Sequence, residues 1–333
     1  MISAAKYPDM TSALEIQWLD AFSSDVELQN VKQLYKVEST DNLDGYISSL
    51  DGFSPARVKE EGDDLPYLSL TQNYRKAWTT YVIGGMEKIT WELRKGDKYG
   101  EITDRIRGMA KSAAERMMYD LTHRFTYAAS TTYTDADGRS VSITGGDGFQ
   151  WAYSAHTVNG ASTTYRNIVS GNPVLSKTGL EAAEVLFMTQ MIDENGNPKP
   201  RKASHLVVFG DSNTVNTALE YLNSTAAPDT SNSGVFNTYK GRYQLVQLAY
   251  GAMAVSGTGY AYSSTYAKYW ALMDLTNKRN IVKVLQEPMM IDQNTPGARD
   301  FETMDWKFGN FGSYAIVTLD GKGAIFSKGD GTA

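Results

Sequence analysis

Apolar residues recur every three or four positions from Glu101 to Ala129, in the longest such run of the chain. This spacing places them on one face of a helix, and no proline interrupts it. At 1.5 Å per residue the helix would be roughly 43 Å long, which is enough to span a domain. The face consists of Ile102, Ile106, Met109, Ala113, Met117, Leu121, Phe125 and Ala128.

The stretch before this helix, Tyr67–Leu93, is rich in β-branched and aromatic residues, which favour strands. Two such runs, Trp78–Ile83 and Ile89–Leu93, flank the pair Gly84-Gly85. Large apolar side chains are too few for both faces of these strands to be buried. We therefore predict an extended two-stranded projection, which is only marginally stable without a partner.

Near the N-terminus, Leu14, Trp18, Leu19 and Phe22 have the spacing of one face of an amphipathic helix. Short apolar runs broken by Asn, Asp and Gly follow this helix. The pattern predicts an arm that packs on something else and is not a self-contained domain.

The remainder of the chain mixes helix and strand patterns, which indicates an α+β fold. Ser176 is placed to cap a helix that runs to Ile192, and Asp211 or Ser212 a further helix to Leu222. We expect the C-terminal strands to return to the long helix and form one discontinuous domain with it. The predicted strands are 206–209, 242–248, 268–275, 280–287, 299–306, 314–319 and 324–327. Residues 131–148 are expected to form a loop or a hairpin that turns at Asp137-Gly138, and residues 223–234 a polar loop.

The composition excludes several kinds of chemistry. The chain has 333 residues and no cysteine, so it has no disulfides, thiolate metal sites or cysteine nucleophiles. Its net charge of -6 is uneven, because the first 66 residues hold 13 acidic and 5 basic side chains and the rest carries +2. This balance argues against a general nucleic-acid coat. With no signal-peptide pattern and no run near ~20 apolar residues, we expect a soluble chain made in the cytoplasm.

Enzyme signatures are scarce. Walker-type phosphate loops, dinucleotide fingerprints, HExxH and GxSxG are absent. The three histidines, His123, His156 and His205, are widely separated in sequence. A hydrolase or lyase that uses His156 or His205 with nearby carboxylates stays open as an alternative. We predict no catalytic, cofactor-binding or metal-ligating residues, because the acidic groups around Asp135 and Asp193 match turns better than calcium loops.

Charged residues interleave along the long helix. The simpler interpretation is a solvated face with intrahelical ion pairs, such as Glu101 with Arg105 and Asp120 with Arg124. The alternative is a mildly positive surface that faces the acidic N-terminal stretch, within the chain or between subunits.

One long segment has a distinctive order of elements. It runs from Leu175 to Met191, passes through the turn Asp193–Pro198, and continues into the apolar strand His205–Phe209 and another helix. In this order the chain resembles the major capsid proteins of tailed bacteriophages, and among them the Mu-like major head subunit group. The projection at Tyr67–Leu93 looks like the E-loop of that family, and the long helix looks like its spine helix.

The resemblance implies the tailed-phage major capsid fold, an α+β fold of four parts. These would be an N-arm at 1–50, an E-loop at 51–98, a discontinuous P-domain at 99–174 and 276–333, and an A-domain at 175–275. The implied function is self-assembly, as hexamers and pentamers, into the icosahedral shell that encloses the genome of a tailed bacteriophage or prophage. Such a protein would be located in the virion after assembly in the host cytoplasm.

The partners implied by the resemblance are further copies of the chain, a scaffolding protein, portal and decoration proteins, and double-stranded DNA bound without sequence specificity. No membrane is involved. Aromatic side chains dominate interface energies, so we expect inter-subunit contacts at Trp18, Phe22, Trp78, Tyr81 and Trp91. A cellular nanocompartment shell of the same fold is the nearest alternative, and it would need a cargo-docking site.

Overall fold

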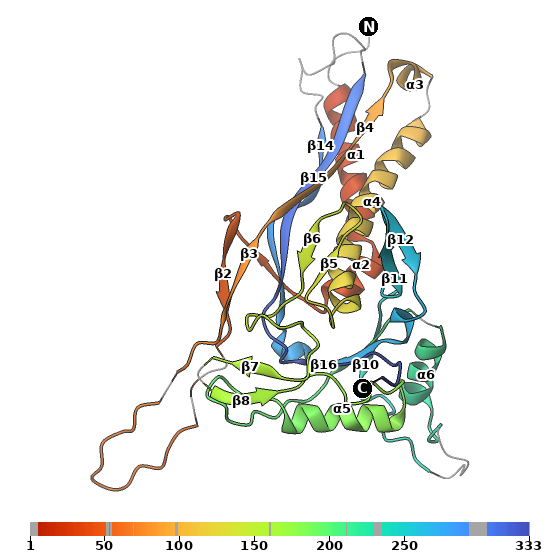
Figure 1. Ribbon diagram of the computed structural model, residues 1–333. Helices are drawn as coiled ribbons and strands as arrows, with labels where there is room; N and C mark the ends of the chain where they lie inside the picture. Colours follow the sequence, from red (N-terminus) through yellow and green to blue (C-terminus); the bar gives the residue numbers. More distant parts are fainter. Residues whose placement is uncertain are drawn as a thin grey trace.

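The computed structural model describes residues 6–50, 53, 55–68, 70–96, 99–159, 161–210, 212–228, 235–292 and 305–332. Figure 1 shows an elongated upper part, in which helices run beside long strands, above a broader base. The helices are α1 (Lys6–Ser23), α2 (Val26–Lys32), α3 (Trp91–Lys95), α4 (Tyr99–Thr126), α5 (Lys177–Thr189) and α6 (Ser212–Asn223).

The strands form two four-stranded sheets and several two-stranded ones. In chain order they are β1 (Lys36–Ser39), β2 (Asp44–Ser48), β3 (Arg75–Thr79), β4 (Tyr81–Ile89), β5 (Thr132–Thr134), β6 (Ser140–Ser142), β7 (His156–Val158), β8 (Ala161–Tyr165), β9 (His205–Val208), β10 (Gln244–Gln247), β11 (Met253–Ser256), β12 (Gly259–Tyr262), β13 (Trp270–Met273), β14 (Asn280–Asp292), β15 (Trp306–Thr318) and β16 (Ala324–Ser327).

The predicted long helix is confirmed as α4, and its apolar face lies in the main core. Helix α1 packs along α4 and contributes Leu14, Trp18 and Phe22 to the same core. The helix thus packs on another element, as expected of an arm, and that element belongs to the same chain. Leu19 is 58% exposed, because the buried stripe follows the four-residue steps from Leu14 to Phe22 and Leu19 lies one residue, about 100°, beyond it.

The long sheet has the strand order β1-β14-β15-β4, with β1 parallel to β14 and the other pairs antiparallel. Gly84 and Gly85 lie inside β4, paired with β15, so the prediction of two strands flanking this pair is wrong. A Cβ atom at Gly84 would lie 2.8 Å from the carbonyl oxygen of Asn310, so the glycine permits this close approach. Trp91 begins α3 and is not part of a strand.

Strand β3 pairs with β2 in an antiparallel ribbon. The segment between them, which we call the projection, extends away from the body at the lower left of Figure 1. A two-stranded ribbon therefore carries the projection, but it is not the one predicted within Tyr67–Leu93, because its first strand is Asp44–Ser48, in the segment predicted as the arm. Local β propensity could not identify this partner, because it lies about thirty residues upstream of β3.

The base contains the second sheet, of order β10-β9-β13-β16, in which β9 is largely buried as predicted. Ser176 caps α5 as predicted, because its hydroxyl accepts a hydrogen bond from the N–H of Gly179. Helix α6 is also confirmed. Asp211, residues 229–234 of the predicted loop and 299–304 of a predicted strand lie outside the described residues. The pairs β7–β8 and β11–β12 were not predicted.

The C-terminal strands return to α4, as predicted. Tyr314 of β15 donates a hydrogen bond to the carboxylate of Asp120 at 2.9 Å. Asp120 is buried and also accepts from Tyr81 at 3.0 Å and from Arg116 at 3.2 Å. This carboxylate therefore joins α4 to β4 and β15 through two tyrosine hydroxyls, while Arg116 pairs with it within the helix.

Of the two ion pairs predicted along α4, one is present and the other is not. Glu101 and Arg105 are 3.2 Å apart, as expected. Arg124 instead donates to the carbonyl of Ser142, while Asp120 pairs with Arg116 on its N-terminal side. Burial explains the difference, because both Asp120 and Arg124 face neighbouring strands rather than solvent.

Candidate assembly surfaces

The projection leaves its apolar side chains uncovered. Val58 is 94% exposed and Tyr67 is fully exposed, and Phe53 and Leu65 are also exposed. An apolar side chain of this size gains about 1.5–3 kcal/mol when it is buried, and the single chain does not realise that gain here. Exposed apolar groups gathered in one segment mark a contact site for another molecule.

The two ends of the projection are tied to a buried charged pair. Asn73 donates its backbone N–H to the carbonyl of Ser49 at 3.2 Å, and its side-chain amide to the Ser49 hydroxyl at 3.1 Å. Ser49 donates to Glu194 at 3.1 Å, and the ammonium of Lys322 lies 3.2 Å from the same carboxylate. Burial lowers the pKa of Lys322, while Asp320 and Glu194 oppose the shift. The projection thus leaves the body from a fixed base.

The three aromatic candidates from the segment Tyr67–Leu93 differ in how much surface they offer. Tyr81 is held by its own chain, through its hydrogen bond to Asp120. Trp78 is half-buried, and its ring covers Gly45 on the neighbouring strand β2. Trp91, at the start of α3, is exposed. Surface for a neighbour therefore remains on Trp91 and partly on Trp78 and Tyr81, and contact of these residues with another subunit stays a prediction.

The other two candidates, Trp18 and Phe22, are core residues of the single chain. Their rings stack with centroids 5.3 Å apart, and they are only 1% and 3% exposed. They have almost no surface left for a neighbouring subunit. We correct the assignment accordingly: these aromatic side chains are buried against α4, because α1 packs there.

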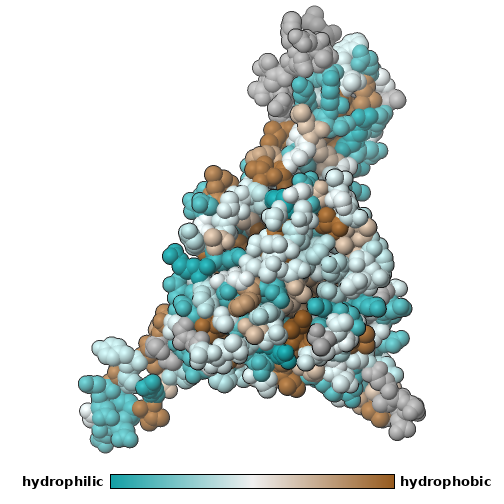
Figure 2. Space-filling view, viewed as in Figure 1, coloured by the Kyte–Doolittle hydropathy of each residue, from teal (hydrophilic) through white to brown (hydrophobic). Residues whose placement is uncertain are grey.

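A second uncovered apolar surface lies on the long sheet, and the sequence analysis missed it. Val82 and Met86 of β4 are 59% and 68% exposed. Met86 and Ile291 are in register with Gly309 between them, so the two side chains share one face of the sheet. Figure 2 shows hydrophobic residues gathered on this upper part of the molecule. Strand β4 is also the edge of the sheet, where unpaired backbone groups favour contacts with another chain.

Neither histidine of the enzyme hypothesis has a catalytic arrangement. His156 is fully buried; its Nδ1 lies 2.7 Å from Asp147 and its Nε2 lies 3.1 Å from the carbonyl of Trp151. His205 lies 2.8 Å from the hydroxyl of Ser204, which also accepts a backbone N–H at 3.1 Å. Burial lowers the pKa of His205, which keeps the ring neutral near pH 7. This geometry gives no support to a histidine-dependent hydrolase.

The acidic segments form turns, as predicted. Asp135 accepts hydrogen bonds from the backbone N–H groups of Asp137 and Arg139, and Asp193 accepts from those of Asn195 and Asn197. Within the described part of the chain, no three His, Asp or Glu side chains are grouped as metal ligands would be. No helix in that part has the length and apolar character needed to cross a membrane.

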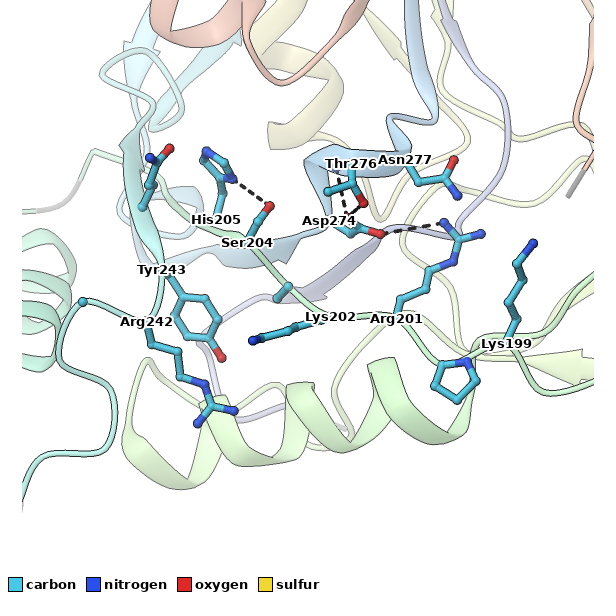
Figure 3. Close-up of a pocket in the computed structure, with 14 residues that line it drawn as sticks. Lys199, Arg201, Lys202, Ser204, His205, Arg242, Tyr243, Asp274, Thr276 and Asn277 are labelled. Atoms are coloured by element: carbon cyan, nitrogen blue, oxygen red, sulfur yellow. Dashed lines mark hydrogen bonds and ion pairs between the residues drawn. The ribbon is translucent and has the colours of Figure 1, made fainter.

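A hollow of about 750 Å³ opens beside the starts of β9 and β10. Its lining carries more positive than negative charge, namely Lys199, Arg201, Lys202 and Arg242 against Asp274. We call this feature the cationic hollow. In Figure 3 the side chain of Lys202 extends towards Tyr243. Arg201 lies 4.0 Å from Asp274, whereas Lys202 and Arg242 are exposed.

No family model and no curated protein matches the sequence. Solved structures match it over most of its length. The capsid of an empty GTA particle matches with a TM-score of 0.51 and 9% identity, over 90% of this chain and 89% of that chain. The capsid of the cyanophage P-SCSP1u matches with a TM-score of 0.51 and 12% identity, over 88% of this chain and 85% of that chain.

These matches define the architecture. The chain has the α+β fold of tailed-phage major capsid proteins, as the sequence predicts. Sequence reasoning missed the exposed face of the long sheet and the cationic hollow. The alternation of Val82 and Met86 around two glycines was the available signal for the first. No sequence signal pointed to the hollow, because its cations come from two separate segments, 199–202 and 242.

Proposed function

We propose that this chain is the major capsid protein of a tailed bacteriophage or prophage. Many copies would assemble into the icosahedral shell that encloses the genome. The observation that carries the proposal is the capsid fold over about nine tenths of the chain. It is joined by a projection whose apolar side chains are uncovered in the single subunit.

The physics of assembly supports this function. Closed rings and shells form when one patch on a subunit meets a different patch on the next copy. The projection and the exposed face of the long sheet are two such patches, one an extended segment and the other a flat surface. Obligate interfaces of this kind bury about 2,000 Å² or more and are more hydrophobic than transient ones.

We also propose the four-part division into N-arm, E-loop, P-domain and A-domain. The pairing of β2 with β3 supports starting the E-loop at Asp44 rather than at residue 51. Helix α4, together with β14 and β15, would form the P-domain, and the sheet containing β9 would belong to the A-domain. Trp78, Tyr81 and Trp91 remain our candidates for inter-subunit contacts, since none of the three is buried in the single chain.

The proposed partners follow from the same function. They are the other copies in hexamers and pentamers, a scaffolding protein, portal and decoration proteins, and packaged double-stranded DNA held without sequence specificity. The net charge of -6 suits a wall that does not bind its DNA tightly. The protein would assemble in the host cytoplasm and reside in the virion.

Sedimentation of the purified full chain tests the proposal. We expect a megadalton species, and nucleic acid protected from nuclease inside particles made during infection. Megadalton particles that never contain nucleic acid would favour a nanocompartment shell instead. A monomer or small oligomer under all assembly conditions would contradict both.

A further inference from the structure

We propose that the tip of the projection of one subunit docks into the cationic hollow of a second copy. We call this tip, which carries Glu60, Glu61, Asp63 and Asp64, the acidic tip. The inference rests on the proposed function and specifies one contact of the shell. The occupant of the hollow is a second copy of the chain, because the tip and the hollow have opposite charges and lie at different places on one subunit.

A tight turn gathers the carboxylates of the tip. The N–H of Asp63 donates to the carbonyl of Glu60 at 3.3 Å, and Gly62 has a φ of +86°, which favours glycine. Four acidic side chains thus lie within five residues, and all four are exposed. In Figure 2 the outer end of the projection is mainly hydrophilic. Arg57 and Lys59 precede these carboxylates, so residues 55–68 carry a net charge of -2, and the tip gains from a cationic partner.

The cationic hollow offers the opposite charge in a fixed shape. Arg201 is buried and held by Asp274, so it contributes a positioned guanidinium at the floor. Lys202 and Arg242 are exposed on the rim. The guanidinium of Arg242 lies 2.8 Å from the carboxylate of Glu184. Its other N–H groups can still donate hydrogen bonds to further carboxylates. The volume of about 750 Å³ accommodates several side chains of a turn.

The tip cannot fill the hollow of its own subunit in this conformation. Thr71 donates to Asn195 at 2.7 Å and Ser49 to Glu194, so both ends of the projection are fixed to the body. From that base the projection runs outward, away from α5 and β10 (Figure 1). A protruding tip and a recess at different places on one subunit are the two halves of a heterologous contact, which repeats from copy to copy.

The affinity of a peptide for the protein measures the contact between tip and hollow without requiring assembly. The probe is a fluorescent peptide of residues 55–68, and the control is the same peptide with Glu60→Gln, Glu61→Gln, Asp63→Asn and Asp64→Asn. We expect unassembled full-length protein to bind the native peptide, of net charge -2, at least tenfold more tightly than the control peptide, of net charge +2. Binding to a Lys202→Glu/Arg242→Glu variant should be at least tenfold weaker. Absent binding, or binding indifferent to either change, overturns the proposal.

Charge reversal in the full chain gives a second readout. Asp63→Lys/Asp64→Lys and Lys202→Glu/Arg242→Glu should each reduce particle formation at least tenfold, and their combination should restore it. The control is Lys111→Glu, an exposed cation of α4 outside the hollow, which should neither block assembly alone nor rescue the tip variant. Unimpaired assembly of both reversed variants, or failure of the combination to rescue, overturns the docking.

The outcomes separate this inference from the proposed function. Peptide binding by a protein that never forms particles would retain the docking and reject the capsid. Particles that form without any dependence on these charges would retain the capsid and reject the docking. A short DNA duplex that occupies the hollow while the peptide does not would identify a phosphate site and also overturn the inference.

Discussion

Replacement of Trp18 by alanine tests whether α1 belongs to the core of the single subunit. The side chain is 1% exposed and stacks on Phe22 at 5.3 Å. Removal of a fully buried tryptophan costs about 3–5 kcal/mol. The indole N–H has no hydrogen-bond partner among the described residues, so its loss relieves about 1 kcal/mol of desolvation. The expected loss of unfolding free energy is therefore about 3 kcal/mol.

The assay is urea unfolding of the unassembled protein, followed by circular dichroism. With a slope of about 3 kcal/mol per molar urea, Trp18→Ala should lower the midpoint by about 1 M. The matched control is Leu19→Ala on the exposed side of the same helix, which should change stability by less than about 0.5 kcal/mol. If Trp18→Ala behaved like the control yet abolished assembly, α1 would be free in the subunit and Trp18 an inter-subunit anchor after all.

Three further changes test other parts of the structure. Asp120→Asn weakens a buried acceptor of two tyrosine hydroxyls and an arginine, so thermal unfolding should show a loss of about 3–5 kcal/mol; a loss below 1 kcal/mol would refute this role. Gly84→Ala should destabilise by about 1–3 kcal/mol because its Cβ would meet a backbone oxygen at 2.8 Å, whereas Gly85→Ala meets only a side-chain oxygen and should cost less; equal effects would contradict the strand pairing. Burial lowers the pKa of His123 below its ordinary 6.5, so below pH 6.5 the unfolded chain binds a proton that the folded one does not. The free energy of unfolding should therefore fall from about pH 6.5 downwards, and it should fall less in His123→Gln. If urea unfolding gave the same pH dependence for both proteins, His123 would not be its cause.

Helices α1, α4, α5 and α6 were predictable, because their signals are local, whereas α2 was not predicted and α3 begins where a strand was expected. The three- and four-residue steps of α4 and the cap at Ser176 both appear within a few residues of sequence. Strand pairing was not predictable in the same way. Gly84-Gly85 has the local character of a turn, and only its partner strand β15, more than two hundred residues away, makes it the interior of a sheet.

The candidate contact residues likewise divide into what the local sequence predicts and what depends on tertiary structure. Aromatic residues bury large areas wherever they pack, but sequence cannot tell whether a ring packs inside the subunit or on a neighbour. Trp18 packs inside, because α4 offers a long apolar face beside it, whereas Trp91 keeps its surface. The cationic hollow depends on tertiary structure, since Arg242 lies far in sequence from Lys199 and Lys202.

Electron microscopy of the purified full chain under assembly conditions tests the central claim most directly. The account predicts closed, uniform shells with icosahedral outlines, built from rings of five and six copies. Dispersed monomers or small oligomers, in a preparation shown by circular dichroism to be folded, would contradict it.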